Sequence, residues 1–182
     1  MIIGITGTDG AGKGAVVNYM IKKHGYSHFS VRGEIIKEIE ARNLPVDRAT
    51  MRLVSNDLRA KYGKSVWIKR ALEVKKETKV KKIIIESIRA LAEVEDLKTN
   101  GGILIAVDAR PEERYRRISS RKSESDAVSY EQFLAQEQLE MNDPDPNGMQ
   151  KSAVMKSADF VLMNNKSIVS LYKKIDVVLA GL

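Results

Sequence analysis

The clearest chemical signal in this chain is a glycine-rich turn with a single lysine. It reads Gly-Thr-Asp-Gly-Ala-Gly-Lys-Gly over residues 7–14 and lies between an apolar run and a helical pattern. Glycines let successive backbone N–H groups point into one hollow, the following helix adds the positive end of its dipole, and Lys13 adds a mobile cation. The turn predicts a triphosphate site with contacts from Gly7, Asp9, Gly10, Ala11, Gly12, Lys13, Gly14 and Ala15.

One expected side chain is missing from this turn. The spacing fits the phosphate-loop pattern at its first glycine, its second glycine and the lysine, but Gly14 stands where that pattern has Ser or Thr, and Ala15 follows. The hydroxyl that normally touches Mg2+ is therefore absent. Glu86 ends an Ile-Ile-Ile run, a position typical of an acidic residue that holds Mg2+ through water. The alternative is that Glu86 pairs with a neighbouring Arg or Lys.

Asp9 lies inside the turn, and two interpretations of it stay open. Its carboxylate could orient an acceptor hydroxyl or a magnesium-bound water, which would make it part of a catalytic site. It could equally stabilise the turn through a bond to nearby backbone.

Short apolar runs alternate with helical patterns along the chain. The runs span residues 2–6, 26–30, 82–86, 103–107 and 159–163. This alternation predicts a parallel sheet, and segments that are apolar on successive residues, 83–85 and 103–107, favour central strands covered by helices on both faces. We therefore expect an α/β fold, a three-layer sandwich with a five-stranded parallel sheet, in which residues 1–182 form one domain.

Two helix-rich stretches are long enough to cover a ligand. The stretch between the second and third runs predicts helices over 33–42, 47–62 and 65–80, so residues 32–80 are expected to form a cap over an acceptor. Residues 111–157 separate the fourth and fifth runs, and we expect residues 120–148 to form a lid over bound nucleotide.

The carboxyl ends of the strands should share one crevice, because ligands of doubly wound sheets gather there. Besides the glycine-rich turn, the residues after the runs are Arg32, Gly33, Glu34, Lys37, Glu86, Arg89, Asp108, Arg110, Asn164 and Asn165. Strand ends are usually polar, so no single one of these residues indicates function alone. His24 and His28 lack the partners and spacing of a metal or nucleophile site.

Three arginines are spaced to share one helix face. Arg114, Arg117 and Arg121 fall at i, i+3 and i+7 after Pro111. This face could meet phosphate, or it could be solvated, since basic helix faces are common.

Charge and composition narrow the classes of partner. The formal net charge is +7, which suits an anionic nucleotide as well as a nucleic acid. Aromatic residues make up only 5%, which argues against the stacking platforms of a nucleic-acid partner. With no cysteine, no signal-like start and no apolar run near the roughly 20 residues of a membrane span, we expect a soluble cytoplasmic protein without a membrane partner. The oligomeric state stays open.

Several of these motifs together resemble the nucleoside monophosphate kinases. In that family the lysine of the loop is also followed by glycine, with a Ser or Thr next, where this chain has Ala15. The segment 32–37 looks like the start of the acceptor-binding helix, with Lys37 in place of the usual arginine. The segment 85–89 resembles the one in which an acidic residue, here Glu86, precedes the arginine that holds the acceptor phosphate, here Arg89.

The resemblance extends to the end of the chain. Residues 107–121 are similar to the strand and helix whose two arginines meet the adenine and the donor phosphates, which implies that role for Arg117 and Arg121. Residues 158–171 look like the last strand and helix of dephospho-coenzyme A kinases, with Lys166 where glycine is common. The overall order of motifs is closest to that of the archaeal adenylate-kinase-related proteins.

The resemblance implies a kinase that uses ATP and Mg2+. It would move the γ-phosphoryl group to a nucleoside monophosphate or a related small acceptor. The implied catalytic residues are Lys13, Asp9, Arg89, Arg117 and Arg121, and the implied acceptor residues are Arg32, Gly33, Glu34, Lys37 and Arg89. The alternatives are a dephospho-coenzyme A-type kinase and a nucleotide-binding regulatory protein with weak or no kinase activity. The acceptor and the choice of ATP over GTP stay open.

Overall fold

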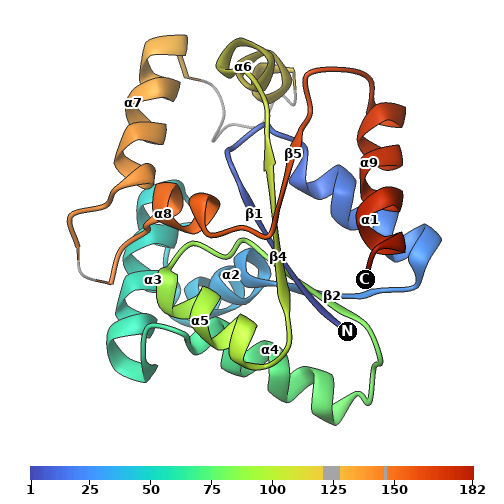
Figure 1. Cartoon of the computed structure of the whole chain (residues 1–182). Helices are drawn as coiled ribbons and strands as arrows, with labels where there is room; N and C mark the ends of the chain where they lie inside the picture. Colours follow the sequence, from blue (N-terminus) through green and yellow to red (C-terminus); the bar gives the residue numbers. More distant parts are fainter. Residues whose placement is uncertain (121–127, 146) are drawn as a thin grey trace.

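Strands and helices alternate along the chain as the apolar runs predict (Figure 1). The computed structural model describes residues 1–120, 128–145 and 147–182. Its strands are β1 (Ile2–Gly7), β2 (Ser27–Ser30), β3 (Ile83–Glu86), β4 (Ile103–Asp108) and β5 (Phe160–Met163). Its helices are α1 (Lys13–His24), α2 (Val31–Ala41), α3 (Arg48–Tyr62), α4 (Val66–Glu77), α5 (Leu91–Thr99), α6 (Pro111–Ser119), α7 (Tyr130–Met141), α8 (Lys151–Lys156) and α9 (Ile168–Ala180).

The strands pair in parallel in the order β2-β3-β1-β4-β5. β1 is central, so that Ile3 lies opposite Ile84 on one side and Ile103 on the other. The expectation of a five-stranded parallel sheet is confirmed, and the two runs expected to be central are the strands that flank β1.

Two apolar cores lie on opposite faces of the sheet, because successive side chains of a strand point to opposite sides. In β3, Ile83 and Ile85 pack with α2 to α5, whereas Ile84 packs with α1 and α9. The strands are apolar on both faces because helices cover both, which gives the three layers of Figure 1.

Capping side chains set where several helices begin. α2 begins two residues before the predicted start because the Ser30 hydroxyl accepts the main-chain N–H of Gly33. Asp47 caps α3 in the same way through Thr50. In α9, Leu171, Ile175 and Val178 are buried, whereas Ile168 in the first turn is 43% exposed. Within the described residues, no helix has the length and apolar character to cross a membrane.

Candidate functional site

The glycine-rich turn leaves β1 in a backbone conformation that its glycines make possible. Gly7 has φ of 132° and Gly12 has φ of 109°, both in the region that L side chains rarely adopt. A Cβ atom at Gly7 would clash with the main chain of Val107 on β4, and one at Gly12 would lie 2.6 Å from Asn164 Nδ2. The loop therefore lies tightly against the strands and residues that follow it in the chain.

Residues from the carboxyl ends of β4 and β5 brace this loop. The Thr8 hydroxyl donates to Asp108 Oδ1 at 2.5 Å, and Asn164 Nδ2 donates to the Ala11 carbonyl at 2.8 Å. Arg117 on α6 donates to the carbonyls of Gly10 at 3.4 Å and Asn164 at 2.8 Å. These contacts link the loop after β1 to segments that lie a hundred or more residues later in the chain.

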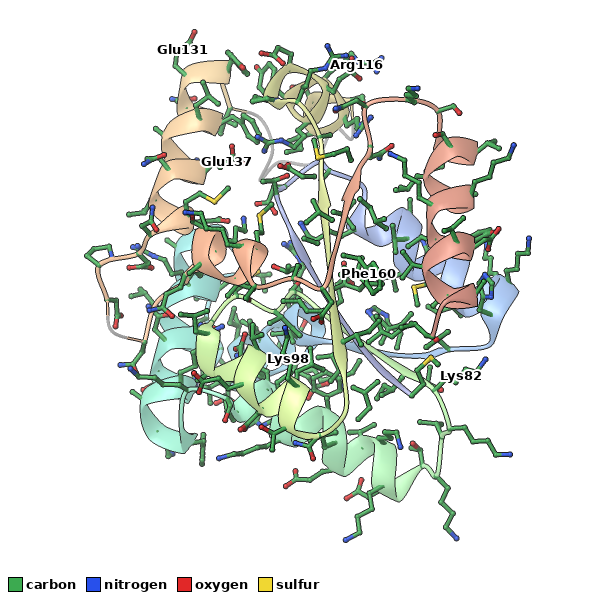
Figure 2. The ribbon with its side chains drawn as sticks, in the orientation of Figure 1. Lys82, Lys98, Arg116, Glu131, Glu137 and Phe160 are labelled. Carbon is green, nitrogen blue, oxygen red and sulfur yellow. The ribbon has the colours of Figure 1, made fainter. Side chains whose placement is uncertain are left out.

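Arg114 is buried against the loop and is not part of a solvated stripe. Its side chain is 4% exposed, and it donates to the carbonyls of Ala109 at 2.8 Å and Asp9 at 3.4 Å. Its guanidinium also forms a two-pronged ion pair with Glu137. Figure 2 shows Glu137 on the inner side of α7, whereas Glu131 points outward at the start of the same helix. The remaining arginine of the predicted face, Arg121, lies outside the described residues.

Lys13 occupies the concave side of its own loop. Its Nζ donates to the carbonyls of Gly7 at 2.9 Å and Thr8 at 2.7 Å and lies 3.4 Å from Asp9 Oδ1. Burial lowers the pKa of Lys13 to about 8, against the opposing effect of the Asp9 carboxylate. Burial therefore destabilises the charged form of Lys13, and an added negative charge beside the ammonium would stabilise it.

A cavity of about 500 Å3 extends from the loop to α2 and α3. Residues expected in the site that line it are Asp9, Gly10, Gly12, Lys13, Gly14, Arg32, Glu86 and Arg89. Unexpected residues that line it are Val31, Ile35, Met51, Arg52, Ser55, Arg59, Ser87, Ile118, Glu140 and Met149. The cavity thus combines an apolar wall with several guanidinium groups, which suits a ligand with an apolar body and an anionic group.

Other expected site residues lie outside this lining. The main-chain N–H of Gly33 donates to the Ser30 hydroxyl at the N-terminus of α2. Lys37 is 73% exposed and pairs with Glu34 at 2.7 Å. Gly7, Ala11 and Ala15 shape the loop and the start of α1 without lining the cavity, and Arg117 contacts the loop from α6.

Glu86 pairs with a histidine whose spacing along the sequence does not indicate a role. Its Oε2 lies 3.0 Å from His28 Nε2 on the neighbouring strand β2. Burial raises the pKa of Glu86, but the hydrogen bond with His28 and the charges of His28, Lys13 and Arg89 outweigh burial and hold it below its usual range. Glu86 is therefore an ionised carboxylate that lines the cavity.

Arg89 reaches the cavity from the turn after β3. Its NH1 lies 3.1 Å from the Met149 sulfur and 3.7 Å from Glu140 Oε2, and its main-chain N–H donates to Glu93 at 2.8 Å. Glu140 comes from α7 and Glu93 from α5, and sequence reasoning missed both. The one signal for Glu93 was its position three residues after Ala90, which directly precedes α5, because an acidic side chain at that position can cap a helix.

Comparisons with known proteins place this chain in a family. A family described as AAA domain matches residues 3–142. A UPF0200 protein from Thermococcus sibiricus is 30% identical, across 97% of this chain and 92% of its own length. The chain belongs to the UPF0200 proteins and carries an AAA domain. A UPF0200 relative from Methanothermobacter thermautotrophicus is 29% identical across 96% of this chain and 86% of its own length.

Solved structures similar to this UPF0200 chain include kinases. TT1252 from Thermus thermophilus superposes with a TM-score of 0.65 at 26% identity, across all of this chain and 97% of its own. A shikimate kinase from Bacteroides thetaiotaomicron has a TM-score of 0.64 at 14% identity, across 99% and 98% of the two chains. A deoxyadenosine kinase from M. mycoides has a TM-score of 0.58 at 16% identity across both whole chains. The UPF0200 chain therefore has the fold of phosphate-loop kinases.

Proposed function

We propose that this chain is an ATP-dependent phosphotransferase that moves the γ-phosphoryl group to a nucleoside monophosphate or a related small acceptor. The observation that carries this proposal is that Lys13, at the end of the glycine-rich loop, lines the same cavity as Arg89. Phosphoryl transfer needs donor phosphates and acceptor to meet in one sheltered hollow, where positioning and charge neutralisation provide most of the catalysis.

On the donor side, Lys13 and the loop amides bind the β and γ phosphates. Lys13 Nζ donates to the carbonyls of Gly7 and Thr8, so it already lies within the loop. When nucleotide binds, phosphate oxygens replace these two carbonyls as its acceptors. Arg117 already contacts the loop at Gly10 and closes over the donor together with Arg121 in the lid, residues 120–148.

On the acceptor side, Arg89 and Arg32 hold the acceptor's anionic group within the cavity. In the proposed complex, Gly33, Glu34 and Lys37 of the cap, residues 32–80, would contact any part of the acceptor that extends past the cavity. In the reaction an acceptor oxygen bonds to the γ phosphorus, the bond from that phosphorus to the β–γ bridging oxygen breaks, and ADP leaves with the electron pair. No covalent intermediate with the protein is needed.

The residues present fit Mg2+ held mainly by the nucleotide. Asp9 and Glu86 provide carboxylate oxygens in the cavity, the ligand type that Mg2+ prefers, and Mg2+ usually keeps several waters. Among the described residues, no three His, Cys, Asp or Glu side chains form a cluster that could hold a metal by themselves. Asp9 and Glu86 would therefore contact the ion through water, and the ion would neutralise charge on the β and γ phosphates.

A nucleotide-binding protein without useful transfer is the second candidate function. It is favoured by the missing hydroxyl at Gly14 and Ala15 and by the Glu140 carboxylate, which lies 3.7 Å from Arg89 and competes with an acceptor phosphate. A dephospho-coenzyme A-type kinase is the enzymatic variant, from the resemblance of residues 158–171.

A transfer assay with ATP, Mg2+ and each nucleoside monophosphate or dephospho-coenzyme A, followed by phosphorus NMR, tests the proposal. Lys13→Ala should abolish transfer with the fold intact, while Lys98→Ala, which removes a lysine paired with Asp159, should keep transfer. Unchanged turnover in Lys13→Ala would remove Lys13 from the mechanism. Tight nucleotide binding with no acceptor phosphorylated would favour the regulatory function.

A further inference from the structure

Lys151 is a buried lysine that contacts two carboxylates of the cavity. It is the first residue of α8, and only 1% of its side chain is exposed. Its Nζ lies 2.6 Å from Glu140 Oε2 and 3.7 Å from Asp9 Oδ1. Asp9 and Glu140 line the cavity, and Lys151 lies behind them. Lys151 can therefore act on a ligand only through these two carboxylates.

The charge of Lys151 is not explained by packing. Removing an ammonium group from water costs far more than burying a methionine of similar length, unless the ammonium is well paired. The partners of Lys151 come from two separate segments, the loop after β1 and the end of α7. Its charge therefore serves to bring an α7 carboxylate and a loop carboxylate together at the cavity wall.

Asp9 lies between two lysines that differ in their other partners. Its Oδ1 is 3.4 Å from Lys13 Nζ and 3.7 Å from Lys151 Nζ. Lys13 must turn toward the donor phosphates when nucleotide binds, which weakens its contact with Asp9. Lys151 is anchored to Glu140 and has no such second task. It therefore stays beside Asp9 through the reaction.

We propose that Lys151 is a positioning residue that keeps the Asp9 carboxylate directed into the cavity after Lys13 has engaged the donor phosphates. This role rests on the proposed function. Other cations near Asp9 are Lys13 on α1, Arg89 after β3, and Arg114 on α6, which binds the Asp9 carbonyl. Without Lys151, Asp9 and Glu140 lose a shared cation, so the two carboxylates repel each other and Asp9 loses its fixed direction.

Three variants test this role: Lys151→Met removes the charge, Lys151→Arg restores it, and Lys98→Met removes a lysine from a different Lys–Asp pair. We expect Lys151→Met to lower kcat about tenfold or more while the Kd for ADP changes less than about twofold. Carbon NMR of labelled aspartate with saturating ADP should show a shifted signal for the Asp9 carboxyl carbon. Lys151→Arg should recover most of kcat, and Lys98→Met should match the parent protein.

A lowered melting temperature with unchanged kcat and an unchanged Asp9 carboxyl signal would make Lys151 purely structural and overturn the proposal. If Lys151→Met does not fold, Lys151→Gln provides a neutral variant that keeps a hydrogen-bond donor toward Glu140, and the same two readouts decide. The Asp9 carboxyl signal can be measured without phosphoryl transfer. Absence of transfer in the parent protein would therefore refute the proposed function, while an unmoved Asp9 carboxyl signal would refute the role of Lys151.

Discussion

The buried carboxylate of Glu93 accepts the main-chain N–H of Arg89 at 2.8 Å. Its other oxygen accepts the guanidinium of Arg59 at 3.0 Å, and the Arg59 and Glu93 side chains are only 2% and 1% exposed. Ser87 in the same turn has φ of 75°, a conformation that non-glycine residues rarely adopt. Glu93 thus fixes the turn that directs Arg89 into the cavity.

We expect Glu93→Gln to lower the free energy of unfolding by about 3 kcal/mol, because it leaves the buried Arg59 charge without its counterion. Looser placement of Arg89 should also raise the KM for the acceptor more than the KM for ATP. Urea unfolding and steady-state kinetics measure these effects. Glu38→Gln, which breaks an exposed pair with Arg42, should cost less than about 1 kcal/mol. Equal losses in the two variants would contradict the importance of burial.

Nucleotide affinity should depend on pH through Lys13. The pKa of Lys13 is lowered from 10.5 to about 8 chiefly by burial, and a phosphate beside its ammonium would raise it again. Binding of ADP should therefore take up a proton above pH 8, and the Kd should rise by up to about tenfold per pH unit from there toward 10.5. Calorimetry across this range measures the slope. Lys13→Arg, which stays charged, should show no such slope if it binds.

The same pKa also predicts a change in the stability of the ligand-free protein. Between pH 8 and 10.5 the unfolded chain binds more protons at Lys13 than the folded chain, so stability rises with pH in this window. Below pH 8 the cost of burying the charged lysine is present in full. The difference in unfolding free energy between the parent protein and Lys13→Met isolates this effect, and a difference that is constant from pH 7 to 10 would contradict it.

Position 14 has room for a side chain with the hydroxyl that the loop lacks. A Cβ atom there would meet no heavy atom within 4 Å, and the residue lies in the first turn of α1. Gly14→Ser should leave stability unchanged or raise it by about 0.5 kcal/mol, and it should strengthen the Mg2+ dependence of ATP binding. Gly7→Ala is the opposite case, because its Cβ would clash with Val107, and it should abolish nucleotide binding. Calorimetry with and without Mg2+ compares them.

Asn164 is expected to be a structural support of the loop. Asn164→Ala leaves the buried Ala11 carbonyl without its donor, which should cost about 1–3 kcal/mol and weaken ADP binding. The contact of Arg117 is with the main-chain carbonyl of Asn164, so the substitution does not remove it directly. Asn165→Ala, which removes an exposed bond to the Arg110 N–H, should have a smaller effect in the same thermal and binding measurements.

The strands were predictable because burial on both faces leaves a local mark, a run of apolar residues such as 83–85. The burial of Arg114 was not predictable. Residue spacing places Arg114 on a helix face but cannot show that Glu137 of α7 packs against that face. The pairing of Glu86 with His28 likewise depends on strand order, which sets β2 beside β3. Lys151 carries no local signal at all, because Asp9 and Glu140, its partners among the described residues, are brought to it by tertiary structure.

The bracing of the glycine-rich loop by Val107, Asp108 and Asn164 has a consequence for synthesis of the protein on the ribosome. The loop is made first, but the groups that shape it emerge a hundred or more residues later. A nascent chain that ends before β5 has the complete loop sequence without its full support. We therefore expect nucleotide to protect the nascent chain from proteolysis only after the last strand has emerged. Nucleotide binding would then distinguish a complete chain from an unfinished one.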